Sequence, residues 1–563
     1  MFKLNRFVTS IALLSAASLS LTGCNGGGEE NQDTRTTDVV INSVPQGEQL
    51  EFSNDFLWGS ATAAYQVEGA TSEGGRGFTN WDLYTKQMRM ANGETGDVAI
   101  DQYHRYKEDV KLMADAGLKS YRFSIAWSRI YPTGFPFQVD PVTGQPVLDP
   151  AGNIIQVAPN QAGVDYYSNL IDELIKYDIE PVITLFHWDI PVGLWAAGSF
   201  NNPLTVDMFA AYSKAVFMAY GDRVDKWITM NEPFINATLI EGLMAVVGKQ
   251  AAETGETPSK DALTAIVKNL PLEDLVGTQM TYIHHYLLAH AKAVEIQRQL
   301  ETSGEIIEGD IGLAFDLKIA KPASDSDADK AATELYNSLL NDWYVFPITR
   351  GYYPANVLSR LQADGHNFNM PADKVESDLK FMAQQGLDFL GVNYYSRSTI
   401  SSEVFDSDLG SNRGFNGGNI WNEAYVHNPV EFPKSENGAY DPQGLYDTLM
   451  YLDKEGGGKP ILITENGGGF RVEDKLTDGG EVKDPLRIRY INGHLRATWK
   501  AIDDGADVIG YTAWSLFDNF EWFNGYNGRF GMIYIDYEND LKRIPKSSYY
   551  WYKDTISKDG VKN

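Results

Sequence analysis

The chain has 563 residues, of which 43% are hydrophobic and 12% aromatic, so it can bury a large core. Its formal net charge of −29 argues against nucleic acid as a partner and against a polybasic contact with a membrane. With Cys24 as its one cysteine, the chain can form neither an intramolecular disulfide nor a cysteine zinc cluster, and its eight histidines lack HExxH-type spacing. The sequence gives no sign of a required metal or organic cofactor.

The N-terminal segment, residues 1–23, has the pattern of an export signal. Lys3 and Arg6 precede an apolar run over residues 7–21 that is too short to span a membrane. The segment leads into Leu-Thr-Gly-Cys24, which resembles the bacterial lipobox, whose cysteine is lipidated and becomes the new N-terminus. The alternative is an ordinary signal with a chance cysteine, but the only cysteine of the chain stands where lipidation needs it.

From this resemblance we expect an exported, lipid-anchored protein. Asn25 differs from the aspartate associated with inner-membrane retention, which favours the outer membrane, on either its periplasmic or its surface face. Residues 24–50 contain no aromatic residue and cannot bury enough apolar surface to fold, so we interpret them as a flexible tether. Contact with the membrane would then be made through the N-terminal lipid only.

Eight short apolar runs alternate with amphipathic segments along residues 51–557. Repeated strand–helix units predict a parallel sheet, and eight of them predict an α/β fold closed as a (β/α)8 TIM barrel, followed by a short tail at 558–563. The expected strands are residues 56–62, 120–126, 181–187, 226–231, 310–315, 389–394, 460–466 and 508–514. The expected helices are residues 101–116, 164–177, 205–220, 279–299, 329–348, 375–385, 486–503 and 546–556.

Polar or aromatic residues stand at the C-terminal ends of seven of the eight runs, all but the fifth. In such barrels that face carries the chemistry. The residues are Gln66, Glu68, Arg122, His187, Trp188, Asn231, Glu232, Asn393, Tyr395, Glu465, Trp514, Glu521 and Trp522. Three long insertions, residues 133–161, 242–276 and 396–443, follow the second, fourth and sixth runs, and we expect them on the same face, where loops set specificity.

Two runs end in a glutamate, Glu232 and Glu465. In one barrel both carboxylates would point into the same mouth, and paired carboxylates are the machinery of glycoside hydrolysis. The ordered motifs around them make the chain, from about residue 52 to 552, resemble family 1 glycoside hydrolases, the β-glucosidase family. The resemblance rests on Trp58-Gly59-Ser60-Ala61-Thr62, Tyr65-Gln66-Val67-Glu68-Gly69, Tyr121-Arg122-Phe123-Ser124, Phe186-His187-Trp188-Asp189, Thr229-Met230-Asn231-Glu232-Pro233, Val392-Asn393-Tyr394-Tyr395, Ile463-Thr464-Glu465-Asn466-Gly467 and Trp514-Ser515-Leu516-Phe517-Asp518-Asn519-Phe520-Glu521-Trp522.

The resemblance implies a retaining, exo-acting β-glycosidase in which Glu232 is the acid/base and Glu465 the nucleophile. It implies that Trp514 stacks beneath the terminal sugar and that Arg122 and Tyr395 tune the nucleophile. The substrate-binding residues would be Gln66, His187, Trp188, Asn231, Asn393, Tyr395, Trp514, Glu521 and Trp522. We expect the neighbours of Glu465 to favour its charged form, and the charge of Glu465 together with burial to raise the pKa of Glu232.

The same resemblance points to an unphosphorylated substrate, because the Glu521 carboxylate would repel a sugar phosphate. A β-glucoside is the leading substrate, with β-galactoside and β-fucoside as further candidates. The stretch after Glu241 lacks the family's His-Ala-Pro-Gly, and a Gly/Asn-rich segment fills residues 396–441, so aglycone preference stays open. Linkage preference and oligomeric state stay open as well.

Two alternatives remain beside hydrolysis. One is a transglycosylase on the same site, in which an acceptor sugar replaces water. The other is a catalytically inactive sugar-binding lipoprotein, which predicts the loss of one carboxylate, whereas both are present. A metal pair at His284, His285 and His290 is conceivable, but packing within a helix is favoured.

Overall fold

The computed structural model describes residues 49–87, 91–242, 276–402, 440–471 and 473–562. The predicted signal, Cys24 and most of the tether lie outside the described residues. In the described part, eight parallel strands close into a barrel in the order β10-β11-β2-β3-β4-β5-β6-β8, which confirms the predicted fold class. Each strand lies within two residues of its expected bounds. They are β2 (Leu57–Ala61), β3 (Ser120–Ser124), β4 (Glu180–Phe186), β5 (Lys226–Asn231), β6 (Asp310–Asp316), β8 (Phe389–Asn393), β10 (Ile461–Asn466) and β11 (Val508–Trp514).

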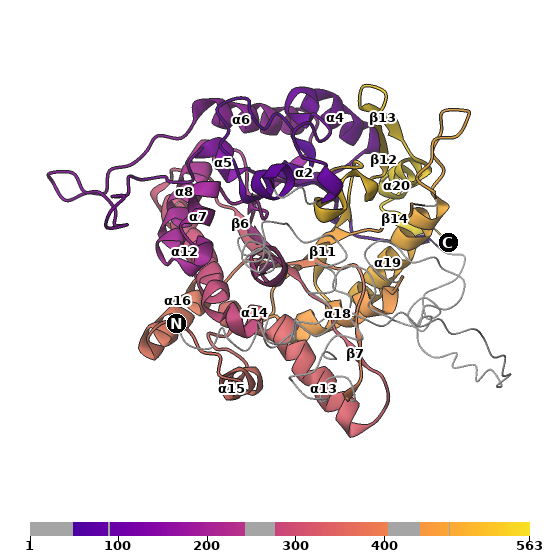
Figure 1. Cartoon of the computed structure of the whole chain (residues 1–563). Coiled ribbons are helices and arrows are strands. Elements are labelled where there is room, and N and C mark those ends of the chain that lie inside the picture. The colour runs from indigo at the N-terminus through magenta and orange to yellow at the C-terminus, as the bar shows by residue number, and fades with distance from the viewer. Residues whose placement is uncertain (1–48, 88–90, 243–275, 403–439, 472, 563) are drawn as a thin grey trace, which may run out of the picture. The chain divides into compact units, whose positions relative to one another are not determined.

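Long helices surround the strands (Figure 1). The barrel interior is filled by apolar side chains from neighbouring strands, among them Val182, Ile228, Ala314, Phe389 and Leu462. The larger core lies between the strands and the helices, where α12 alone buries fifteen residues. The long helices are α4 (Gln102–Ala116), α6 (Gln161–Lys176), α8 (Leu204–Tyr220), α12 (Met280–Ser303), α13 (Asp327–Asn337), α16 (Ala372–Gln385), α18 (Pro442–Glu455), α19 (Pro485–Asp503) and α20 (Ser547–Ser557).

Short elements fill the loops at the two ends of the barrel. The short helices are α2 (Ala64–Val67), α3 (Asn80–Asp82), α5 (Trp127–Ile130), α7 (Val192–Ala196), α14 (Trp343–Thr349) and α15 (Ala355–Ala363). The π and 3-10 turns are η2 (Leu83–Gln87), η3 (Ala91–Gly93), η4 (Ser199–Asn201), η5 (Ile235–Gly242), η6 (Ser338–Asp342) and η7 (Trp522–Asn527). The remaining strands are β1 (Gln49–Glu51), β7 (Lys321–Pro322), β9 (Thr399–Ile400), β12 (Ile533–Asp536), β13 (Lys542–Pro545) and β14 (Gly560–Lys562).

Two expectations about the helices need correction. The single helix expected over residues 329–348 is α13, the π turn η6 and then α14, which contains Pro347. The turn places Asn341 so that its side chain bonds to the segment after β6, a tertiary contact that outweighs helical regularity. Helix α18 begins within the expected insertion over residues 396–443. Its start signal is local: the Asp441 side chain accepts from the Gly444 N–H, and Pro442 occupies the first turn.

The ends of the described chain also differ from expectation. Residues 49 and 50 were assigned to the tether and residues 560–562 to the tail, but they pair as the antiparallel strands β1 and β14.

The insertion at 133–161 is folded by antiparallel bridges such as Val139 with Pro146 and forms the purple loop at the left of Figure 1. Most of the other two insertions lies outside the described residues. Within the described part, no helix has both the length and the apolar character needed to cross a membrane.

Candidate active site

The two glutamates singled out in the sequence lie at the C-terminal end of the barrel. Glu465 is the penultimate residue of β10, and Glu232 follows directly after β5. Both are buried, with exposed fractions of 3% for Glu465 and 6% for Glu232. The fold therefore brings two carboxyl groups, far apart in the sequence, to one rim.

Glu465 is held by a cation and a hydroxyl. The Arg122 guanidinium, from β3, donates through Nη1 to Glu465 Oε1 at 2.7 Å, and the Tyr395 hydroxyl donates to Oε2 at 2.7 Å. Arg122 also donates through Nη2 to Asn231 Oδ1 at 2.6 Å. Each carboxyl oxygen of Glu465 therefore accepts a bond that stabilises negative charge.

Glu232 meets a neutral donor instead. Asn393 Nδ2 donates to Glu232 Oε1 at 2.7 Å and to Asn231 Oδ1 at 3.0 Å. Asn393 Oδ1 accepts from the Thr464 hydroxyl at 2.7 Å, which fixes the orientation of the amide. One unbroken chain of polar contacts thus links the two carboxyl groups, through Tyr395, Glu465, Arg122, Asn231, Asn393 and Glu232.

The two carboxyl groups differ in how firmly they hold a proton. Burial raises the pKa of Glu232 well above its ordinary value, and the charges of Asp316 and Glu465 raise it further. Burial also raises the pKa of Glu465, while Arg122 and Tyr395 oppose that rise. The expectation that these neighbours favour the charged form is correct in sign, but desolvation outweighs them. Glu232 keeps its proton to higher pH than Glu465.

Asp316 is the site residue that the sequence reasoning missed. The fifth run was expected to deliver no polar group to the rim, but the fifth barrel strand, β6, ends in Asp316, which pairs in register with Asn393. Lys318 Nζ lies 3.3 Å from Asp316 Oδ2. The expected strand stopped one residue short, at 315, and a single aspartate after an apolar run gives no signal of its own.

Polar groups suited to a sugar join the same network. Gln66 Nε2 donates to the Phe520 carbonyl at 3.0 Å and to Glu521 Oε2 at 3.3 Å, while its buried Oε1 has no partner among the described residues. Asn231 Nδ2 lies 3.1 Å from His187 Nε2, and burial lowers the pKa of His187 well below its ordinary value. The neutral imidazole accepts at Nε2 and carries its proton on Nδ1, which has no partner in the described part either. The site thus presents one buried acceptor and one buried donor.

Aromatic rings flank these polar groups. The His187 ring stacks near Trp514, with ring centroids 6.0 Å apart, and near Trp522 at 5.9 Å. Trp188 packs against Trp522 at 4.9 Å and donates through Nε1 to the Asn231 carbonyl. The structure therefore brings the residues expected to contact the sugar close together. The hydrogen bond from Trp188 also reaches the backbone of Asn231, the residue before Glu232.

Three of these residues have left-handed backbone conformations. The φ angles are 72° at Trp188, 46° at Glu232 and 47° at Trp522. For residues with a side chain, such conformations cost about 1–3 kcal/mol each, and they persist where the surroundings enforce them. The backbone N–H of Glu232 donates to the Ala314 carbonyl on β6 at 2.7 Å, which is part of that enforcement.

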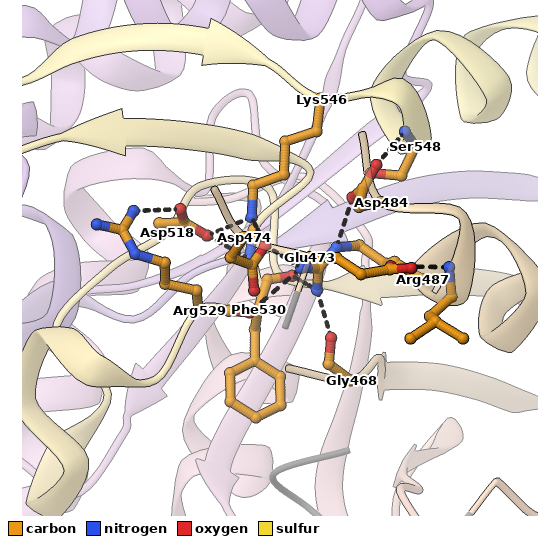
Figure 2. Close-up of polar contacts among 12 residues, drawn as sticks. Gly468, Glu473, Asp474, Asp484, Arg487, Asp518, Arg529, Phe530, Lys546 and Ser548 are labelled. Carbon is orange, nitrogen blue, oxygen red and sulfur yellow. Dashed lines mark hydrogen bonds and ion pairs between the residues drawn. The ribbon is translucent and has the colours of Figure 1, made fainter. Parts of the chain in front are cut away.

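Buried ion pairs hold the loops that follow β10 and β11 (Figure 2). Arg487 pairs with Asp474 and with Asp484, both at 2.8 Å. Lys546 Nζ lies 2.5 Å from Asp474 and 2.9 Å from Asp518. Asp474 belongs to the loop after β10 and Asp518 to the loop after β11, so these contacts join the loop that follows Glu465 to the loop that follows Trp514. We call this group the Arg487 cluster; its members are Asp474, Asp484, Arg487, Asp518, Arg529 and Lys546.

Other residues noted in the sequence serve packing. Glu68, expected at the rim, accepts from Arg129 at 2.6 Å and from the Tyr167 hydroxyl at 2.5 Å, away from the carboxyl pair. The histidines of α12 bond to separate parts of the chain. His284 contacts Tyr353, His285 the Phe200 carbonyl, and His290 the Gly386 carbonyl.

A closed (β/α)8 barrel with a buried carboxyl pair among amides, an imidazole and indoles defines the class of glycoside hydrolases. Comparison with known proteins narrows the class. The chain belongs to glycosyl hydrolase family 1, whose sequence model matches residues 48–142 and 147–561.

Individual relatives align over most of the chain. Beta-glucosidase A of Acetivibrio thermocellus is 38% identical over 514 residues, covering 91% of this chain and 99% of the relative. The 1,4-beta-D-glucan glucohydrolase of Thermotoga neapolitana is 35% identical, with 91% and 99% covered. A solved structure of the family 1 b-glucosidase from Thermotoga maritima in complex with isofagomine lactam has a TM-score of 0.73 and 33% identity, covering 91% of this chain and all of that one. The chain is a glycoside hydrolase.

Proposed function

We propose that this enzyme is a retaining exo-β-glucosidase in which Glu465 is the nucleophile and Glu232 the acid/base. The observation that carries the assignment is the asymmetry of the two carboxyl environments. Glu465 accepts from Arg122 and Tyr395, as a group that must ionise requires. Glu232 is buried beside the neutral Asn393 amide, and its pKa is raised well above the ordinary value by that burial first.

The reaction would proceed in two displacements. In the first, a carboxylate oxygen of Glu465 bonds to the anomeric carbon, the glycosidic C–O bond breaks, and Glu232 gives its proton to the departing oxygen. In the second, Glu232 takes a proton from water, the water oxygen bonds to the anomeric carbon, and Glu465 leaves as a carboxylate. Two inversions return the β-configuration.

The sugar side of the site fits an unphosphorylated hexose. The His187 Nδ1–H donor and the Gln66 Oε1 acceptor are buried and have no partner in the described part of the chain, so hydroxyls of a terminal sugar would satisfy them. The Glu521 carboxylate beside Gln66 would repel a sugar phosphate. The names of the relatives favour a glucoside, with galactoside and fucoside as further candidates.

Two variants test the assignment, with aryl β-glucosides whose leaving groups differ in basicity. Glu465→Ala should lose essentially all turnover of both phenyl and 2,4-dinitrophenyl β-glucoside. Glu232→Ala should lose turnover of the phenyl glucoside but still form the glycosyl-enzyme from the dinitrophenyl glucoside, whose leaving group needs no proton. Glu376→Ala removes an exposed carboxylate and is the matched control.

The configuration of the first product gives an independent check. NMR of the released sugar should show β-glucose before mutarotation. Release of the α-anomer would mean that water attacks directly and would overturn the retaining mechanism. With excess cellobiose as acceptor, a majority of longer oligosaccharides over free glucose would instead identify a transglycosylase on this site.

We also propose that the mature enzyme is anchored by a lipid on Cys24, most suitably to the outer membrane. The support is the signal-like segment before Cys24 and the tether composition after it. In a bacterial host, the N-terminal peptide should begin at a diacylglyceryl-modified Cys24 by mass spectrometry. Cys24→Ser should move the activity from the membrane fraction to the soluble one, and an unmodified cysteine in membrane-free enzyme would rule the anchor out.

A further inference from the structure

At the end of β6, the rim of the barrel carries an ion pair, Asp316 with Lys318, that has no role in the two proposed displacements. Lys318 Nζ lies 3.4 Å from Asp316 Oδ1 and 3.3 Å from Oδ2. The Asp316 side chain is 9% exposed and that of Lys318 is 23% exposed. Charges so shielded from water act on their neighbours with less screening than charges on the surface.

Strand geometry directs Asp316 toward the carboxyl pair. Ala314 belongs to the apolar cluster of the barrel interior, and side chains two residues apart on a strand share a face, so Asp316 continues that face into the mouth. The Ala314 carbonyl accepts from the backbone N–H of Glu232, and Asp316 is in register with Asn393, the residue that donates to Glu232. Asp316 therefore flanks Glu232 from β6, as Asn393 does from β8.

Lys318 is held in place by its backbone. Its N–H donates to Asn341 Oδ1 at 3.1 Å, and its carbonyl accepts from Asn341 Nδ2 at 3.2 Å. The next two N–H groups donate to the side chains of Thr448 and Asn337. Burial lowers the pKa of Lys318, but Asp316 first, with Tyr336 and Glu232, more than offsets this and the net pKa is raised, so the ammonium remains charged. The pair is a fixed feature of the rim, clamped by α13, η6 and α18.

We propose that Asp316 and Lys318 are positioning residues of opposite sign, which set the electrostatic field at the Glu232 carboxyl and thereby the highest pH at which the enzyme protonates its leaving group. The proposal rests on the proposed role of Glu232 as acid/base. Burial comes first in raising the pKa of Glu232, Asp316 raises it further, and Lys318 lowers it.

Neighbouring elements also bring titratable groups close to Glu232 and Asp316. The groups that face Glu232 or Asp316 from neighbouring elements are Glu465, Asn393, Tyr286, Tyr336, Tyr344 and Tyr395. Burial raises the pKa of all four tyrosines, so they are neutral at working pH. Among the described residues, Asp316 and Glu465 raise the pKa of Glu232 and Lys318 lowers it, while the Arg122 guanidinium is paired with Glu465 and also donates to Asn231.

Opposite substitutions should move the pH profile in opposite directions. For phenyl β-glucoside, Asp316→Asn should shift the basic limb of the kcat/KM profile to lower pH by about one unit. The reason is that the negative charge of Asp316 no longer helps to hold the proton on Glu232. Lys318→Met should shift the same limb to higher pH by a smaller amount. The basic limb of the double variant should lie between those of the two single variants. Asp325→Asn and Lys330→Met make the same charge changes at an exposed pair, where the Asp325 side chain is 100% exposed, and should leave the limb in place.

A second substrate separates this role from a structural one. With 2,4-dinitrophenyl β-glucoside, whose leaving group needs no proton, Asp316→Asn should keep kcat/KM within twofold of wild type at every pH. Equal losses on both substrates, or an unmoved basic limb in both single variants, would overturn the proposal. Failure of the proposed function itself would look different: Glu232→Ala would then retain turnover of the phenyl glucoside.

Discussion

Glu465 and Glu232 are chemically identical side chains that meet different partners. Glu465 is contacted by a guanidinium and a hydroxyl, whereas Glu232 is contacted by an amide and has the Asp316 carboxylate nearby. A cation favours the ionised form of a carboxyl group, and an anion favours the protonated form. In the proposed mechanism, this asymmetry would let one glutamate act as nucleophile and the other as acid near neutral pH.

Tyr395→Phe tests the environment of the nucleophile. The Tyr395 hydroxyl keeps its proton, because burial and the charge of Glu465 raise its pKa well above the ordinary value, and it donates to Glu465 Oε2 at 2.7 Å. Without this donor the pKa of Glu465 rises. In its proposed role Glu465 attacks only when ionised, so activity should be lost as pH falls through that pKa. The acidic limb of kcat/KM should therefore move to higher pH by about one unit.

The basic limb of the Tyr395→Phe variant should stay where it is, because the proposed mechanism assigns that limb to Glu232. Tyr550→Phe removes a hydroxyl from a ring that is 59% exposed and should leave both limbs unchanged. A shift of the basic limb alone would mean that the roles of Glu465 and Glu232 are reversed. The measurement is kcat/KM for an aryl β-glucoside across the pH range.

At the scale of the element, the sequence predicts the strands well because each is specified locally. A run such as residues 460–466 is apolar, β-branched and ended by a polar group, which is enough to mark a buried strand and its rim residue. Motifs with fixed order then located Glu232, Glu465 and their amide and indole neighbours. Those residues are brought together by the closure of the barrel alone, which follows once eight strands are counted.

Elements that depend on distant contacts could not be predicted in this way. The three-residue strands β1 and β14 are too short to show a period, and each exists because the other is present. The π turn η6 depends on the bonds between Asn341 and the backbone of Lys318. The position of Asp316 beside Glu232 could not be predicted from the sequence either. It follows from the register of β6 against β5 and β8, which no sequence motif indicates.

Lys546→Met tests the contribution of the Arg487 cluster to the active-site loops. Lys546 is buried and bridges Asp474 and Asp518, so its loss leaves two buried carboxylates with fewer partners and should cost about 3 kcal/mol of unfolding free energy. Because Asp518 lies in the loop between Trp514 and Glu521, KM for aryl β-glucosides should also rise. Lys542→Met removes an exposed ammonium four residues away and should change neither quantity.

The stability lost in Lys546→Met should itself depend on pH. Burial raises the pKa of Asp474, but Arg487 and Lys546 more than offset this, so the folded pKa lies below the ordinary value. A depressed carboxyl pKa contributes stability above the unfolded pKa of about 4, and that contribution disappears as pH falls through the folded pKa. Chemical denaturation should therefore show the gap between wild type and variant narrowing below about pH 4, and a gap that widens there would contradict the ion-pair account.

At the scale of the whole barrel unit, the candidate active site and the β1–β14 strand pair lie at opposite ends of the barrel. The site residues follow the C-terminal ends of the strands. β1 precedes the first barrel strand and β14 follows α20, which runs back to the N-terminal ends of the strands, so this pair closes the other end. In barrels of this kind the N-terminal end serves stability. Changes there should alter unfolding without altering the rate of catalysis.

Removal of residues 558–563 tests this separation. The β1–β14 pair buries Leu50, with 2% exposed, and Val561, with 0%, and the Trp499 indole donates to the Glu51 carbonyl at 3.0 Å. Removing buried Val561 and uncovering Leu50 should cost about 3 kcal/mol and lower the midpoint of thermal unfolding by several degrees. At 25 °C, kcat/KM for an aryl β-glucoside should stay within twofold of wild type, as it should when only residue 563 is removed. A shortened chain that unfolds like wild type but has lost activity would show that the two ends of the barrel are coupled, because no residue of the carboxyl site lies within the deleted segment.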